Sequence, residues 1–109
     1  MKILFDNGTP KPIALSLAEH EITYARKIGW HELKNGDLIL KAEEAGYELL
    51  LTTDKNMRYQ QNLAGRKIAI VVLGNQQWPD VRLHVDRIIA AVNAATPGCY
   101  LEVNIPHRK

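Results

Sequence analysis

Two short apolar segments of this chain each end next to an aspartate, and these carboxylates are the residues best suited to chemistry. Asp6 follows Ile-Leu-Phe at residues 3–5, and Asp54 follows Leu-Leu-Leu-Thr-Thr at residues 49–53. An apolar run without polar alternation is typical of a strand covered on both faces in a parallel sheet. Ligands of such sheets bind beyond the carboxyl ends of the strands. If the two strands lie parallel and adjacent, both acids emerge at the same edge.

Asp37 is the third candidate acid, because it lies in the first turn of a predicted helix. It joins Asp6 and Asp54 if that helix begins at the carboxyl edge of the sheet. Three carboxylates in one cleft repel one another unless a divalent cation neutralises them, and oxygen ligands with retained waters suit Mg²⁺ or Mn²⁺. A metal held in this way activates water and stabilises the charge that develops on a phosphodiester. The three acids therefore indicate metal-dependent phosphodiester hydrolysis.

Each acid also has a structural interpretation. Asp6 begins Asp-Asn-Gly, a favourable turn sequence, and Asp54 can cap the segment that follows it. Asp37 complements a helix N-terminus and can pair with Lys41 four residues later. Spacing alone does not distinguish these roles from a shared metal site.

The periodicity of the chain predicts alternating strands and helices. Strands are expected at residues 2–5, 21–24, 48–53, 68–73 and 100–105, the last at an edge. A first helix runs to about residue 18 with Thr9 as its N-cap, and a second begins after Asn35 as cap and ends at Gly46. A short polar helix is expected at residues 56–64, and the longest begins at Pro79-Asp80. The apolar positions of the second helix are Leu38, Ala42 and Ala45, and those of the longest are Val81, Val85, Ile88, Ile89 and Val92.

This alternation predicts an α/β fold with three layers, α/β/α, around a central, mainly parallel sheet of four or five strands. Residues 49–52 and 68–73 are expected at the centre of the sheet. The length of 109 residues fits one domain, residues 1–109, and 46% hydrophobic with 24% charged residues is an ordinary globular balance.

Composition excludes several other classes of protein. Fourteen basic against twelve acidic residues give a net charge of +2, too small for nucleic-acid binding through a global field, so any such binding needs a local basic patch. One cysteine excludes an intramolecular disulfide. No apolar run approaches the roughly 20 residues that cross a bilayer, and no signal peptide is evident. We therefore expect a cytoplasmic protein with no membrane partner.

Three segments together resemble the small bacterial PIN-like proteins of the DUF5615 type. They are the first strand closing on Asp6 with a proline-containing helix after it, the helix start Asn-Gly-Asp-Leu-Ile-Leu at residues 35–40, and Leu-Leu-Thr-Thr-Asp-Lys-Asn at residues 50–56. The resemblance covers residues 1 to about 73. It implies a PIN-like α/β/α fold, a Mg²⁺- or Mn²⁺-dependent ribonuclease with Asp6, Asp37 and Asp54 as catalytic, metal-binding acids, and often an antitoxin partner.

The chain departs from this family at two positions. Asn7 stands where many relatives have Glu, and Asn56 stands where many have a second Asp. An asparagine can ligate a metal through its carbonyl oxygen but adds no charge, so Asn56 is counted as a metal ligand of a weakened site. The alternative is a catalytically inactive PIN-like module that binds nucleic acid or protein.

RNA is the expected substrate, and three residues near the acids are candidates to contact it: Asn7, Lys55 and Arg58. Solvated surface charge is the other interpretation of the two basic residues. The apolar end of the longest helix, residues 90–95, predicts a homodimer or an antitoxin-bound complex.

Overall fold

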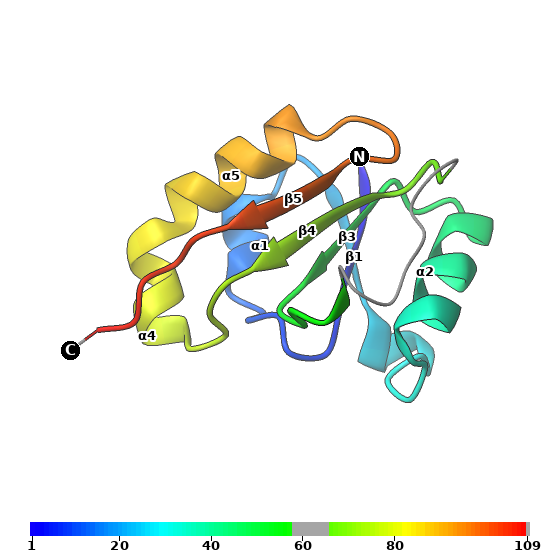
Figure 1. The fold of residues 1–109 in the computed structure, drawn as a ribbon, viewed down its shortest axis with the longest axis horizontal. Coiled ribbons are helices and arrows are strands. Elements are labelled where there is room, and N and C mark those ends of the chain that lie inside the picture. Colours follow the sequence, from blue (N-terminus) through cyan, green and yellow to red (C-terminus); the bar gives the residue numbers. More distant parts are fainter. Residues whose placement is uncertain (58–65, 109) are drawn as a thin grey trace.

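A computed structural model describes residues 1–57 and 66–108 of the chain. Its centre is one sheet of five parallel strands in the order β2-β1-β3-β4-β5. The strands are β1 (Lys2–Phe5), β2 (Glu21–Tyr24), β3 (Leu49–Thr52), β4 (Ala69–Leu73) and β5 (Tyr100–Val103). Every neighbouring pair of strands is parallel, which confirms the predicted parallel sheet with residues 49–52 at its centre, and Figure 1 shows the arrows of β3, β4 and β5 pointing toward the same edge.

The strand sequences explain their places in the sheet. Every residue of β3 and β4 is buried, as expected for strands without polar alternation, whereas β2 and β5 are partly exposed edge strands. Successive side chains point to opposite faces, so each strand supplies two cores. The expected strand at 48–53 is one residue shorter at each end, that at 68–73 begins one residue later, and that at 100–105 ends at Val103.

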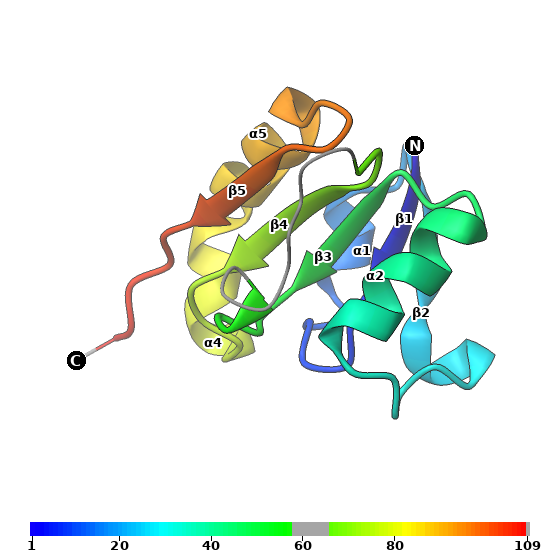
Figure 2. The ribbon, with the colours of Figure 1, turned by 45° about the vertical axis from the view of Figure 1, so that its right-hand side comes forward.

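Helices cover both faces of the sheet and give the predicted three layers (Figures 1 and 2). One face packs on α1 (Ile13–Ser16), α4 (Trp78–Val81) and α5 (Val85–Ala94), with Ile13, Val81 and Ile88 in its core. The opposite face packs on α2 (Asn35–Glu44) through Leu38, Ile39 and Ala42. Short 3₁₀ segments, η1 (Ala25–Ile28) and η2 (Arg82–His84), lie before α2 and between α4 and α5.

Two helix starts differ from the predictions. The first helix begins at Ile13 rather than near Pro10, because Thr9 is buried and its hydroxyl donates to the carbonyl oxygen of Leu51 at 2.9 Å instead of capping a helix. The second begins at Asn35 itself, so Lys34 occupies the cap position.

The helix faces also differ in part from the predictions. Ala45 is exposed, and Ile39 takes its place beside Leu38 and Ala42 in the core. The predicted longest helix is divided by η2, although Val81, Ile88 and Val92 are buried as expected and Val85 and Ile89 are half-buried. The helix predicted at residues 56–64 lies almost wholly outside the described residues. None of the described helices is long and apolar enough to cross a membrane.

Candidate functional site at the carboxyl edge

The two strands that carry Asp6 and Asp54 are neighbours. β1 and β3 pair in parallel, with Phe5 opposite Leu51, so both acids follow adjacent strand ends, as the sequence predicted. The chain goes from β1 to β2 on one side and later returns to β3 on the other side of β1. The gap between β1 and β3 is therefore the switch point of this doubly wound sheet, where ligands of open α/β sheets bind.

Thr52 connects the two acids. Its hydroxyl donates to Oδ2 of Asp6 at 2.8 Å and accepts the backbone N–H of Asp54 at 3.1 Å. The backbone N–H of Asp6 donates to the carbonyl oxygen of Leu51 at 3.0 Å, which continues the ladder of β1 and β3 by one residue. Thr52 itself is fully buried, and both of these hydrogen bonds are partly buried. In the sequence, Thr52 is only the last residue of an apolar run, and no local pattern indicates this role.

Each carboxylate also shapes its own loop. Oδ1 of Asp6 accepts the backbone N–H of Asn7 at 2.8 Å, and Oδ1 of Asp54 accepts that of Asn56 at 2.9 Å. These are the turn and capping functions that residue types alone had suggested. They leave additional lone pairs on both carboxylates, so the structural role and a ligand role are compatible.

The other residues predicted to bind metal or RNA lie in the loops after β1 and β3, or outside the described residues. Asn7 donates its side-chain N–H to the carbonyl oxygen of His31 at 2.7 Å and so joins the β1 loop to the segment before α2. Asn56 and Lys55 are exposed in the β3 loop, and Arg58 lies outside the described residues.

Asp37 is on the outer surface of α2. α2 begins at the carboxyl edge of the sheet, as expected, but Asp37 is exposed and lines a separate shallow hollow with Leu33, Leu40, Lys41 and Glu44. Among residues 1–57 and 66–108, no three His, Cys, Asp or Glu side chains form a group that could hold a metal ion. The structure thus brings Asp6 and Asp54 to one place and gives Asp37 a different environment.

The loops after β3 and β4 and the chain after β5 form a hollow of about 380 Å³ that Asp54 lines, here called the edge hollow. A Cβ added to Gly8 in the β1 loop would collide with the Thr53 hydroxyl and lie 3.2 Å from Oε1 of Gln76, so the loops after β1, β3 and β4 touch. The edge hollow is lined by Thr53, Asp54, Lys55, Gly74, Asn75, Gln76, Gln77 and His107.

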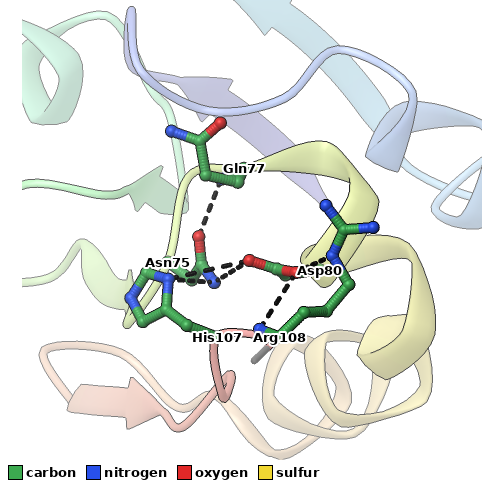
Figure 3. Close-up of polar contacts among 5 residues, drawn as sticks. All are labelled: Asn75, Gln77, Asp80, His107 and Arg108. Carbon is green, nitrogen blue, oxygen red and sulfur yellow. Dashed lines mark hydrogen bonds and ion pairs between the residues drawn. The ribbon is translucent and has the colours of Figure 1, made fainter.

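Asp80, a buried acid in the first turn of α4, lies behind the edge hollow. Asp80 is 5% exposed, and Figure 3 shows it between Asn75 and the C-terminal Arg108. Its Oδ2 accepts from Asn75 Nδ2 at 2.9 Å, and its Oδ1 accepts from Arg108 Nε at 2.6 Å. The hydrogen bond from Asn75, and then those from Arg108, hold the pKa of the Asp80 carboxyl below its ordinary value. Pro79-Asp80 is a usual start of a helix, so nothing in the local sequence signals this burial.

Comparisons of the chain with protein-family profiles, with curated proteins and with solved structures gave no match.

Proposed function

We propose that this protein is a metal-dependent endoribonuclease whose cation is held by Asp6 and Asp54. The observation that supports the proposal best is the position of these acids on adjacent parallel strand ends at the switch point of the sheet. The resemblance to PIN-like proteins of the DUF5615 type supplies RNA as the substrate. The role as the toxin of a toxin-antitoxin pair depends on that resemblance alone.

The donor set fits Mg²⁺ or Mn²⁺. Mg²⁺ in proteins is commonly held by one or two carboxylates and keeps several waters, so the pair of acids is sufficient without Asp37. Asn56 adds a neutral amide oxygen in the same loop as Asp54. When bound, the cation would supply an activated water and neutralise charge on the phosphate.

The protein's own residues have defined tasks in this proposal. Thr52 fixes the orientation of the Asp6 carboxylate and the backbone of Asp54, so the pair is preorganised before a cation arrives. Lys55, exposed at the rim of the edge hollow, is placed to attract phosphates of the RNA chain.

The test is cleavage of single-stranded RNA by purified Asp6→Asn and Asp54→Asn proteins with Mn²⁺ and with EDTA. We expect each variant to fold normally, because Asn is nearly isosteric, and to lose activity by at least about 100-fold, since the site has no carboxylate to spare. Asp86→Asn on the exposed surface of α5 is the matched control and should retain full activity.

Asp37→Asn decides whether the third acid takes part. Loss of cleavage in this variant would add Asp37 to the site, and unchanged cleavage would restrict it to Asp6 and Asp54. Cleavage that survives EDTA and both substitutions would refute the proposal. If the unmodified protein binds RNA but neither cleaves it nor gains thermal stability from Mn²⁺, the inactive binding module is the correct function.

A further inference from the structure

The chain after β5 is attached to the end of β4 and to α4. The backbone N–H of Gly74 donates to the carbonyl oxygen of Val103 at 2.9 Å, and Ile105 is buried with 2% exposure. Farther along, Asp80 Oδ1 accepts both the backbone N–H of Arg108, at 3.3 Å, and its Nε, at 2.6 Å. The C-terminal segment therefore follows a fixed course toward α4, visible beyond β5 in Figure 1.

This course places His107 at the rim of the edge hollow, and Asn75 fixes the orientation of its ring. Asn75 Oδ1 accepts the backbone N–H of Gln77 at 2.8 Å, so its amide nitrogen must be the atom that faces the other neighbours. That Nδ2 donates one hydrogen to Asp80 and lies 3.0 Å from His107 Nδ1. Figure 3 shows this arrangement, with the second ring nitrogen of His107 turned away from Asp80.

The contact determines where the imidazole carries its proton. In neutral His107, Nδ1 accepts from Asn75, so the hydrogen is on Nε2. In protonated His107 both nitrogens carry hydrogens, and Nδ1 faces Oδ2 of Asp80 at 3.6 Å. Nε2 therefore bears a hydrogen in both states, and His107 presents a donor whose side chain is 66% exposed.

Lys55 lines the same hollow and provides a cation there. Asp54 is the one acid among the described residues that line the hollow. The His107 N–H and the Lys55 ammonium are both hydrogen-bond donors of the kind that bind phosphate oxygens. Asp54 also lines the hollow and repels an anion, so the His107 donor and the Lys55 ammonium bind the phosphate against that one negative charge.

We propose that the edge hollow is a phosphate subsite in which His107 Nε2–H and the Lys55 ammonium bind a backbone phosphate of single-stranded RNA next to the one held at the acid pair. This inference rests on the proposed function, because it identifies how the substrate is held. Asn75 and Asp80 are positioning residues that keep His107 in place.

The test measures binding of a fluorescent oligouridine of about ten nucleotides in EDTA, so that metal-dependent cleavage does not interfere. We expect His107→Ala to weaken binding about tenfold, the usual effect of losing a hydrogen bond to a charged group. Lys55→Ala should also weaken binding and reduce the salt dependence by about one phosphate contact. His20→Ala and Lys67→Ala, both at the amino edge of the sheet, are the matched controls and should bind as the unmodified protein does.

The outcomes separate this inference from the proposed function. Weaker binding in His107→Ala and Lys55→Ala supports the subsite even if the protein never cleaves RNA. Equal binding in His107→Ala, or no RNA binding by the unmodified protein, overturns it even if cleavage by the acid pair is confirmed.

The positioning role has its own readout. The ¹⁵N chemical shifts of the His107 ring should report a hydrogen on Nε2, and Asn75→Ala should allow the neutral ring to populate the other tautomer. A folded Asn75→Ala protein with the original His107 tautomer would refute the role of Asn75. Arg108→Ala, which leaves His107 present but loosens the segment, should weaken RNA binding less than His107→Ala does.

Discussion

At the scale of single residues, the Thr52 hydroxyl is the group on which the geometry of the acid pair depends. It is buried and satisfies Asp6 Oδ2 and the Asp54 N–H together. We expect Thr52→Val to destabilise the protein by about 1–3 kcal/mol, because the half-buried Asp6 carboxylate and Asp54 N–H each lose a hydrogen bond. Urea denaturation measures this, and Thr52→Ser, which keeps the hydroxyl, should recover most of the loss. Equal stability of the Val variant and the unmodified protein would show that the bridge is unimportant.

Asp80 gives the protein a pH dependence with a defined sign. Its folded pKa lies below the unfolded value of about 3.9, so the folded state binds fewer protons in that range. The stabilisation is complete above the unfolded pKa and is lost as the pH falls through the folded pKa. We expect Asp80→Asn to flatten the fall in the free energy of unfolding below about pH 5. Glu43, whose pKa is lowered first by the backbone N–H of Lys67, contributes with the same sign, so Glu43→Gln is the comparison variant.

At the scale of elements, the turn that leads into β5 depends on a glycine that no other residue can replace. Gly98 has φ of +77°, and a Cβ there would collide with the carbonyl oxygen of Arg66. Its N–H donates to the carbonyl oxygen of Lys67 at 3.0 Å and so joins this turn to the start of β4. We expect Gly98→Ala to destabilise the protein more than Gly46→Ala, because Gly46 has φ of +88° but a Cβ there would meet no atom of the described residues within 4 Å.

The Gly46 variant isolates the backbone cost of a positive φ, about 1–2 kcal/mol, and the difference between the two variants measures the collision. Thermal unfolding of both proteins is the measurement. Equal destabilisation of the two variants would mean that the turn at Gly98 relieves the collision without a further loss of stability.

At the scale of the whole molecule, the layer formed by α1, α4, η2 and α5 exposes two large apolar side chains, Leu15 at 84% and Leu83 at 56%. Ala90 and Ala94 in α5 are also exposed, whereas Val92 is buried. We expect a homodimer through this layer, because clustered exposed apolar groups usually mark an interaction site. Sedimentation equilibrium should show Leu15→Glu shifted toward monomer, while Leu40→Glu on α2, in the opposite layer, should not shift. A monomer at every concentration for the unmodified protein would contradict this expectation.

The sequence by itself determined the strands and the ends at which the acids emerge. Apolar runs without polar alternation, such as those in Leu49–Thr52 and Ala69–Leu73, favour a strand buried on both faces, and strands of that kind need helices on each side. The position of Asp6 and Asp54 at carboxyl ends follows from the same local pattern. These features depend on neighbouring residues, which is why pattern reasoning found them.

Only the tertiary structure decided which of the acids meet and what supports them. The hydrogen bond from Thr52 to Asp6 spans 46 positions, and that from Arg108 to Asp80 spans 28. No local pattern encodes such contacts, because they arise from strand order and from the course of the chain after β5. For the same reason, no local rule showed that Asp80, in the first turn of α4, is buried, or that Asp37 lies on the exposed surface of α2.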